Sequence, residues 1–217
     1  MAIRLHRGGR FRRWLGARFG GDFALGDRIW RRILHGLGAA ALIYYALPTD
    51  FFVVAPKLYV LLAALAAVLV LELLRHAIGL ELPTIRDYER ERLGSFAVFG
   101  VAIVVAILLF PMPIACAVVL GTAIVDPLAG ELRRTPRVPG IDLAVPFGVY
   151  ALLAFAGLTL LGRWPPLASG GLALVAAAIA VAVERPKVWW FDDDIVMTLV
   201  PALALFLLGV VLLGLPG

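Results

Sequence analysis

The stretch CAVVLGTAIVDPLAGELRR (Cys116–Arg134) sets the carboxylate of Asp126 inside an otherwise apolar run of membrane length. An ionised carboxylate there is costly, so it usually faces a polar cavity and serves a function. At helical spacing Thr122, Asp126 and Gly130 share one face, which could bind a cation or a phosphate. Pro127 disfavours a regular helix at Asp126 and would free backbone carbonyls beside it. An aspartate at a helix end, level with the lipid headgroups, is the alternative, and both interpretations stay open.

Composition identifies the class of protein. Hydrophobic residues make up 62% of the 217 residues, charged residues 16%, and the mean hydropathy is +0.96. A soluble domain of this length needs far fewer apolar residues, so we expect an integral membrane protein. The net charge of +5 is better explained by orientation and by contact with anionic lipid than by nucleic acid, which we exclude as a partner. The single cysteine, Cys116, precludes an intramolecular disulfide and lies in apolar surroundings that favour a packing role.

The first 30 residues are basic and aromatic. Residues 1–32 hold nine arginines, interleaved with Phe11, Trp14, Phe19, Phe23 and Trp30. We expect residues 1–30 to form a cytoplasmic, interfacial arm, with arginines at lipid phosphates and aromatic rings at headgroup depth. The segment is too long and too rich in arginine for a typical secretory signal, so we expect no cleavage. A disordered basic tail is the alternative for residues 1–20. Residues 31–217 are expected to form one transmembrane domain.

Seven apolar runs follow the arm. They cover residues 33–49, 56–74, 94–111, 113–130, 145–162, 166–184 and 195–215. Each run is near the ~20 residues with which a helix crosses the hydrocarbon core, which predicts an all-α bundle of seven transmembrane helices. Only Pro111, Met112 and Pro113 separate the third and fourth runs, so these two helices should be adjacent and antiparallel.

The basic residues orient this bundle. Starting from the amino terminus, the segments that alternate with the runs hold nine, one, four, zero, three, one, two and zero lysines and arginines, where Lys57 at the start of the second run is counted with the segment before it. One side therefore carries 18 of the 20 basic residues. By the positive-inside rule the amino terminus is cytoplasmic and the carboxy terminus is outside. A count of six or eight helices would break this alternation.

The predicted topology brings acidic groups from distant segments to the cytoplasmic side. Asp126 would lie at the end of the fourth helix and Asp192–Asp194 at the start of the seventh, near Glu72 and the segment Arg86–Arg92. Basic residues flank them on the same side: Arg133, Arg134 and Lys187. Carboxylates that hold Mg²⁺, together with basic groups that hold phosphate oxygens, are what nucleotide-dependent phosphoryl transfer requires.

Three successive aspartates repel one another unless a cation compensates. A divalent metal ion would do so at Asp192–Asp194, whereas one aspartate is enough to cap the helix that follows. A solvated acidic turn paired with Arg185 or Lys187 is the alternative. Glu72 and His76 stand four residues apart and could share a metal, but a local pair of Glu72 with Arg75 or His76 is favoured.

Four short motifs occur in order along the chain: Arg31-Arg-Ile-Leu-His35, Arg86-Asp-Tyr-Glu89, Asp126-Pro-Leu-Ala129 and Asp192-Asp-Asp-Ile-Val196. Together they resemble the dolichol kinase and phytol kinase family of membrane-embedded lipid-alcohol kinases, which are related to phosphatidate cytidylyltransferases. Their order and their common predicted side make the resemblance more specific than any single motif. It covers residues 31–215.

The resemblance implies a kinase-like domain that transfers a phosphoryl group from a nucleoside triphosphate, commonly CTP, to an isoprenoid or similar lipid alcohol with Mg²⁺. Asp126 would be a metal ligand or the base that orients the hydroxyl. Asp192 and Asp193 would hold the metal and nucleotide, with Asp194 where the family commonly has asparagine. The expected phosphate contacts are Arg133, Arg134, Arg137 and Lys187, and the expected contacts to substrate or lipid headgroup are Arg32, His35, Arg86, Glu89 and Thr122.

The chain departs from the family pattern after the Asp-Pro element. The family usually has a Lys-Ser/Thr-x-Glu-Gly stretch there, whereas this chain reads Arg133-Arg-Thr-Pro-Arg-Val-Pro-Gly-Ile-Asp-Leu-Ala144. Arg137 could replace the lysine and Asp142 in part the glutamate, although neither pair is equivalent in geometry. Two alternatives therefore stay open: a membrane protein that binds lipid or a protein partner without catalysis, and a cytidylyltransferase-like enzyme. A transporter is a less favoured third.

Overall fold

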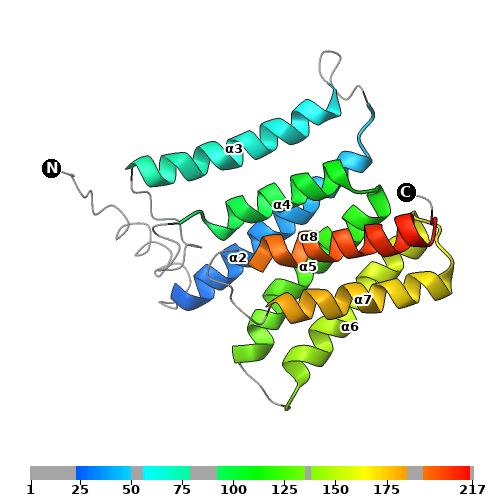
Figure 1. The fold of residues 1–217 in the computed structure, drawn as a ribbon. Helices are drawn as coiled ribbons and strands as arrows, with labels where there is room; N and C mark the ends of the chain where they lie inside the picture. Colours follow the sequence, from blue (N-terminus) through cyan, green and yellow to red (C-terminus); the bar gives the residue numbers. More distant parts are fainter. Residues whose placement is uncertain (1–22, 50–55, 79–91, 135–137, 185–192, 216–217) are drawn as a thin grey trace.

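The computed structural model describes residues 23–49, 56–78, 92–134, 138–184 and 193–215, in which the only regular secondary structure is helical. The helices are α2 (Phe23–Ala40), α3 (Lys57–Ile78), α4 (Ser95–Leu109), α5 (Met112–Arg134), α6 (Ile141–Ala156), α7 (Pro166–Glu184) and α8 (Asp193–Leu205) (Figure 1). A 3₁₀ turn, η1 (Ala41–Tyr45), extends α2, and π-helical segments, η3 (Gly157–Leu161) and η4 (Phe206–Leu212), extend α6 and α8. Each predicted apolar run overlaps one of these helices.

Five of the described helices are long and apolar enough to cross a membrane. They span Lys57–Ile78, Met112–Arg133, Ile141–Leu161, Pro166–Glu184 and Asp193–Leu212. Helix α4 is equally apolar but has only 15 residues, because the chain turns at Pro111. Helix α2 begins at Phe23, so its first turns carry polar residues that precede the predicted run. The chain therefore folds as a helical membrane bundle.

Two expectations about prolines had different outcomes. The turn around Pro111 is as tight as predicted, since α4 ends at Leu109, α5 begins at Met112, and the two helices are in contact. The predicted break at Pro127 is wrong, because α5 continues through this residue to Arg134. A proline removes one backbone donor, and a helix packed on several sides tolerates that loss.

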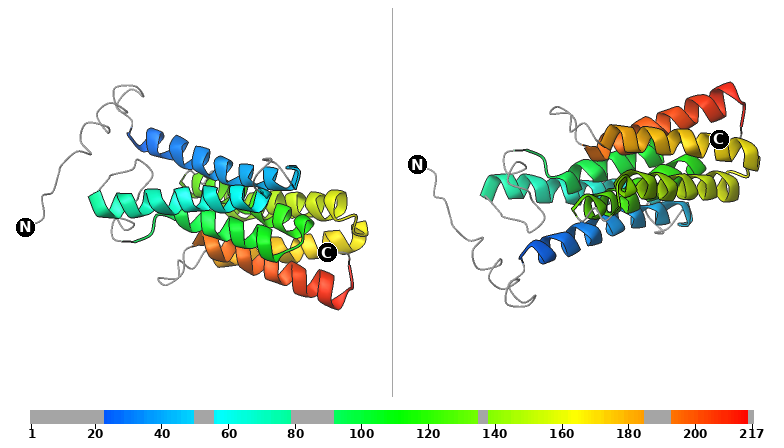
Figure 2. Two further views of the ribbon diagram at one scale, coloured as in Figure 1. Left: turned by 90° about the horizontal axis from the view of Figure 1, so that it is seen from above. Right: turned by 90° about the horizontal axis from the view of Figure 1, so that it is seen from below.

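Helix α5 is the centre of the bundle. It contacts α2, α4, α6 and α8, and 72% of its membrane-length segment is buried, against 11% for α3. Helix α3 packs against α4 and η1 at the edge of the bundle (Figures 1 and 2). Its exposed leucines, including Leu62, Leu69 and Leu73, suit a surface that faces lipid.

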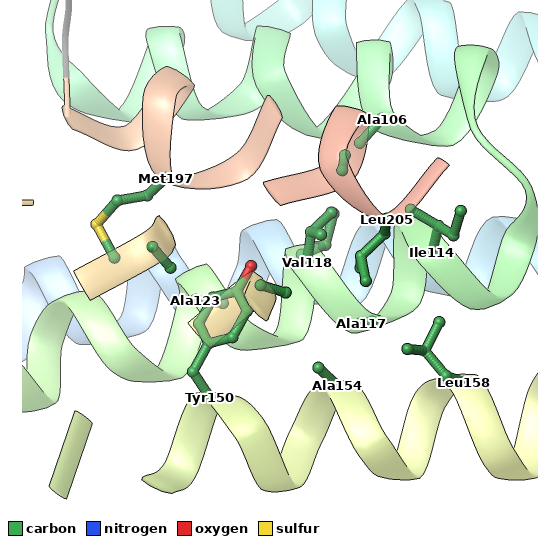
Figure 3. Close-up of a cluster of buried hydrophobic side chains, with 14 of the residues drawn as sticks. Ala106, Ile114, Ala117, Val118, Ala123, Tyr150, Ala154, Leu158, Met197 and Leu205 are labelled. Carbon is green, nitrogen blue, oxygen red and sulfur yellow. The ribbon is translucent and has the colours of Figure 1, made fainter. Parts of the chain in front are cut away.

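Small residues let the central helices approach closely. In α7, Ala176, Ala177 and Ala180 are fully buried, as is typical of helix contacts in a membrane. Gly121 of α5 lies against the ring of Tyr150 from α6, so a Cβ atom at position 121 would come within 2.6 Å of that ring. Figure 3 shows Tyr150 reaching from α6 toward α5 in the middle of this core.

The helices alternate in direction, which decides where the polar residues meet. The end of α5 and the start of α8 lie toward one end of the bundle, on the side where α2 begins (Figures 1 and 2). The carboxylates of Asp126 and Asp194 are thereby brought to the same end from helices that are distant in the sequence.

Candidate functional site

Three buried side chains from three helices meet at this end of the bundle: His35 of α2, Asp126 of α5 and Asp194 of α8. The Nε2 atom of His35 lies 3.2 Å from Oδ2 of Asp126 and 3.6 Å from Oδ1 of Asp194. The exposed fractions of the three residues are 2%, 5% and 0%. One possible ligand atom from each lies within 4.8 Å of the others. We call these residues the His–Asp–Asp group.

Packing between α2 and α4 holds the imidazole. The ring of His35 stacks on Phe99 of α4, with 5.0 Å between ring centroids and 22° between planes. Gly38 of α2 leaves the space that Phe99 occupies, since a Cβ atom at position 38 would lie 2.7 Å from a carbon of that ring. The glycine thus permits the stacking that fixes the orientation of His35.

Buried threonines hold the two carboxylates in register. The Thr122 hydroxyl donates to the carbonyl oxygen of Met197 at 3.2 Å. The Thr198 hydroxyl donates to the carbonyl oxygen of Asp194 at 2.7 Å and also lies 3.2 Å from the Thr122 hydroxyl oxygen. These contacts join α5 to the first turns of α8 one turn away from Asp126. Thr122, which we expected to contact substrate, therefore links two helices.

Ion pairs engage two of the arginines that we expected to bind substrate. Arg133 of α5 pairs with Glu184 at the end of α7, and Arg32 of α2 pairs with Glu131 of α5 at 3.2 Å. The Arg133 and Arg32 side chains are 40% and 55% exposed, so they lie nearer solvent than the His–Asp–Asp group. A phosphate would compete with the glutamate for part of the guanidinium of either arginine.

Glu72 takes part in a separate network, as the favoured interpretation predicted. It forms a two-pronged ion pair with Arg75, with N–O distances of 2.9 and 2.6 Å, and lies 3.3 Å from Nε2 of His76. Its Oε1 atom also accepts the backbone N–H of Gly94 at 2.7 Å, and Arg75 donates to the carbonyl oxygen of Arg92. Glu72 therefore ties the end of α3 to the start of α4, and these contacts give it a structural role.

The remaining predicted site residues separate into two sets. Asp193 is the first residue of α8, is half-buried, and lies outside the His–Asp–Asp group. Arg134 closes α5, and its side chain is not among those described. The others lie outside the described residues: Arg86, Glu89, Arg137, Lys187 and Asp192.

Two residues have roles that the sequence did not indicate: His35 contacts both carboxylates, and Glu131 pairs with Arg32. We expected His35 to contact substrate or a lipid headgroup, and the structure buries it beside the two carboxylates. Asp194, expected to stand in a position commonly held by asparagine, is the member of the acidic run that meets Asp126. In the sequence, Glu131 lies five residues after Asp126, and Arg32 lies three residues before His35. These spacings alone do not show which residues meet. The contact between α2 and α5 pairs Arg32 with Glu131 and His35 with Asp126.

The His–Asp–Asp group has the size and chemistry of a site for one divalent cation. Metal–nitrogen and metal–oxygen bonds of about 2.0–2.2 Å put the ligands of one ion up to roughly 4.4 Å apart. The separations of 3.2 and 3.6 Å around Nε2 fall within that range. Two carboxylates and an imidazole are common metal ligands.

Comparison of the chain with protein-family models, curated proteins and solved structures finds no match. The function of this chain must therefore be inferred from its sequence motifs, its membrane bundle and the His–Asp–Asp group.

Proposed function

We propose that this chain is a membrane lipid-alcohol kinase, which transfers a phosphoryl group from CTP or another nucleoside triphosphate to a polyprenol or related isoprenoid alcohol. The observation that carries the proposal is the meeting of Asp126 and Asp194, from two distant helices, at the buried imidazole of His35. A buried pair of carboxylates is energetically costly in a membrane bundle, and such residues usually mark a functional site. The motif order of the sequence supplies the reaction class.

The proposal includes a topology of seven crossings, with a cytoplasmic amino terminus and the carboxy terminus outside. The excess of basic residues on one predicted side, 18 of 20, supports it. In that arrangement the end of α5 and the start of α8 face the cytoplasm, where nucleoside triphosphates are available. The lipid acceptor would reach the same depth from the bilayer, with its chain between helices and its hydroxyl toward Asp126.

Each residue then has a defined task. Asp126 and Asp194, with Asp192 and Asp193 nearby in the sequence, would hold a divalent cation, for which Mg²⁺ is the ion that usually accompanies a nucleotide. Such an ion neutralises negative charge on the transferred phosphoryl group. Asp126 would also orient the acceptor hydroxyl and accept its proton. Basic residues at the same end would contact the phosphates: Arg133, Arg134, Arg137 and Lys187.

The experiment is a transfer assay with the purified protein in lipid nanodiscs. Label from γ-labelled CTP or ATP should appear on a polyprenol from a panel of lipid alcohols, as separated by thin-layer chromatography. Asp126→Asn should abolish the transfer, while Asp50→Asn, in a loop predicted on the opposite side, should leave it unchanged. Unchanged transfer in Asp126→Asn would reject the assignment. In a parallel assay with α-labelled CTP and phosphatidate as the acceptor, transfer of label to the lipid with release of pyrophosphate would instead indicate a cytidylyltransferase.

A second candidate, binding of lipid or a protein partner without catalysis, is favoured by a different observation. Asp194 is fully buried, and Arg133 is engaged by Glu184, which is the arrangement of a structural polar network. This candidate predicts no nucleotide binding that depends on Mg²⁺. A thermal-shift titration with CTP, with and without Mg²⁺, separates the two, since only the kinase should be stabilised by the combination.

A further inference from the structure

We infer that the His–Asp–Asp group binds a divalent ion of borderline softness, represented by Zn²⁺, in preference to Mg²⁺. At this group the inference replaces the Mg²⁺ of the proposed kinase with Zn²⁺, and it is testable whether or not the chain is a kinase. It depends on the donor atoms, their burial and their charge.

The donor atoms include an imidazole nitrogen beside both carboxylates. Nε2 of His35 lies 3.2 Å from Oδ2 of Asp126 and 3.6 Å from Oδ1 of Asp194, so one ion among these three atoms would have a nitrogen ligand as well as two oxygen ligands. Mg²⁺ prefers oxygen ligands, whereas imidazole suits Zn²⁺ and other transition metals. Three protein ligands with one open position is the ligand count of catalytic zinc sites.

Burial acts in the same direction. Mg²⁺ gives up its water molecules reluctantly and usually keeps several of them in a protein site. The three side chains are 2%, 5% and 0% exposed, and one ligand atom from each lies within 4.8 Å of the others. This buried site therefore suits Zn²⁺, which takes four ligands, better than Mg²⁺, which takes six.

The charge of the group favours binding of a divalent cation. Ionised Asp126 and Asp194 together carry two negative charges. A protonated His35 would offset one of these charges, whereas a divalent cation would offset both. Charge buried in a membrane bundle is costly, and an ion that offsets both carboxylates lowers this cost more than the imidazolium does.

The surrounding helices hold the ligands in place in advance. Stacking on Phe99 fixes the imidazole, and the hydrogen bond from Thr198 to the Asp194 backbone fixes the first turn of α8. Because the ligands come from α2, α5 and α8, a bound ion would also join three helices, and its removal should lower the thermal stability of the bundle.

The first test measures the metal itself. The protein is purified without a histidine tag and without chelators, and its metal content is determined by mass spectrometry. We expect about one zinc ion per chain, as for a site that binds a single ion. After chelation, Co²⁺ should restore stability and give a visible ligand-field absorption that persists in a large excess of Mg²⁺. Absence of saturable Co²⁺ and Zn²⁺ binding, or displacement of Co²⁺ by Mg²⁺ at comparable concentration, would overturn the inference.

The second test uses matched histidine variants. His35→Asn removes the nitrogen and should weaken Zn²⁺ binding by at least about tenfold to a hundredfold, the scale of losing even an outer partner of a metal ligand. His76→Asn, at a histidine whose side chain is 37% exposed, is the control and should bind Zn²⁺ as the wild type does. His35→Asp, which restores a third ligand as oxygen, should shift the preference toward Mg²⁺. Equal Zn²⁺ affinity in His35→Asn and His76→Asn would overturn the inference.

These readouts are separable from the proposed function. A protein that holds zinc and transfers no phosphate would reject the kinase and keep the metal site. A protein that transfers phosphate with Mg²⁺ and binds no transition metal would keep the kinase and reject the metal site.

Discussion

Gly38→Ala should destabilise the bundle and disturb the candidate site through a single steric contact. The added Cβ atom would lie 2.7 and 3.1 Å from two carbons of the Phe99 ring and 2.9 Å from Cδ1 of Ile103. Carbon atoms prefer separations of about 3.5–4.0 Å, so the shortest contact overlaps by nearly an ångström. The end of Ile103 can rotate away. The Phe99 ring is only 2% exposed and stacks on His35, so it has little space in which to move.

The expected magnitude follows from overpacking of a buried site. Forcing an extra methyl into a well-packed core costs about 1–3 kcal/mol. Gly36→Ala provides the matched control, because a Cβ atom at Gly36 meets nothing within 4 Å and the residue lies in the same helix. Both substitutions change the backbone entropy and helix propensity alike, by about 0.5–1 kcal/mol. The difference between the two variants therefore isolates the clash.

Reversible unfolding of the purified protein in mixed micelles, with increasing denaturing detergent, measures this difference. Gly38→Ala should be less stable than Gly36→Ala by about 1–3 kcal/mol, and its affinity for Co²⁺ should fall because the imidazole moves with Phe99. Equal stability of the two variants would mean that α2 does not pack on Phe99 in the membrane, and the described position of His35 would be wrong.

Three further predictions concern contacts around the site. Glu72→Ala should cost about 3–5 kcal/mol in detergent unfolding, because it leaves an arginine buried without its carboxylate; a loss well below that range would contradict a buried pair. Thr122→Val and Thr198→Val should show a coupling of about 0.6 kcal/mol in a double-mutant cycle, a typical value for a hydrogen bond between membrane helices, and strictly additive effects would exclude the contact. Gly121→Ala should lower the melting temperature, since its Cβ atom would come within 2.6 Å of the Tyr150 ring, and an unchanged melting temperature would refute that packing.

The sequence determined the helical class and the approximate position of each helix. A run of apolar residues long enough to cross the hydrocarbon core is a local property, so it can be read without knowing any tertiary contact. The Pro111 turn was equally local. The common location of Asp126 and the Asp192–Asp194 run followed from counting helices between them, because each helix reverses the direction of the chain. The structure confirms that Asp126 lies close to Asp194, whereas Asp192 lies outside the described residues.

Which residues share the site depends on contacts between helices that the sequence does not specify locally. The role of His35 depends on how α2 is rotated against α4 and α5, and the pairing of Arg133 with Glu184 depends on the contact between α5 and α7. Helices that are apolar on all sides, such as α4, carry little periodic signal to fix such rotations. The continuation of α5 through Pro127 was likewise decided by its neighbours, whose packing on several sides outweighs the local preference of one residue. Side-chain partners across helices are set by shape and by buried charge, which exist only once the helices are in contact.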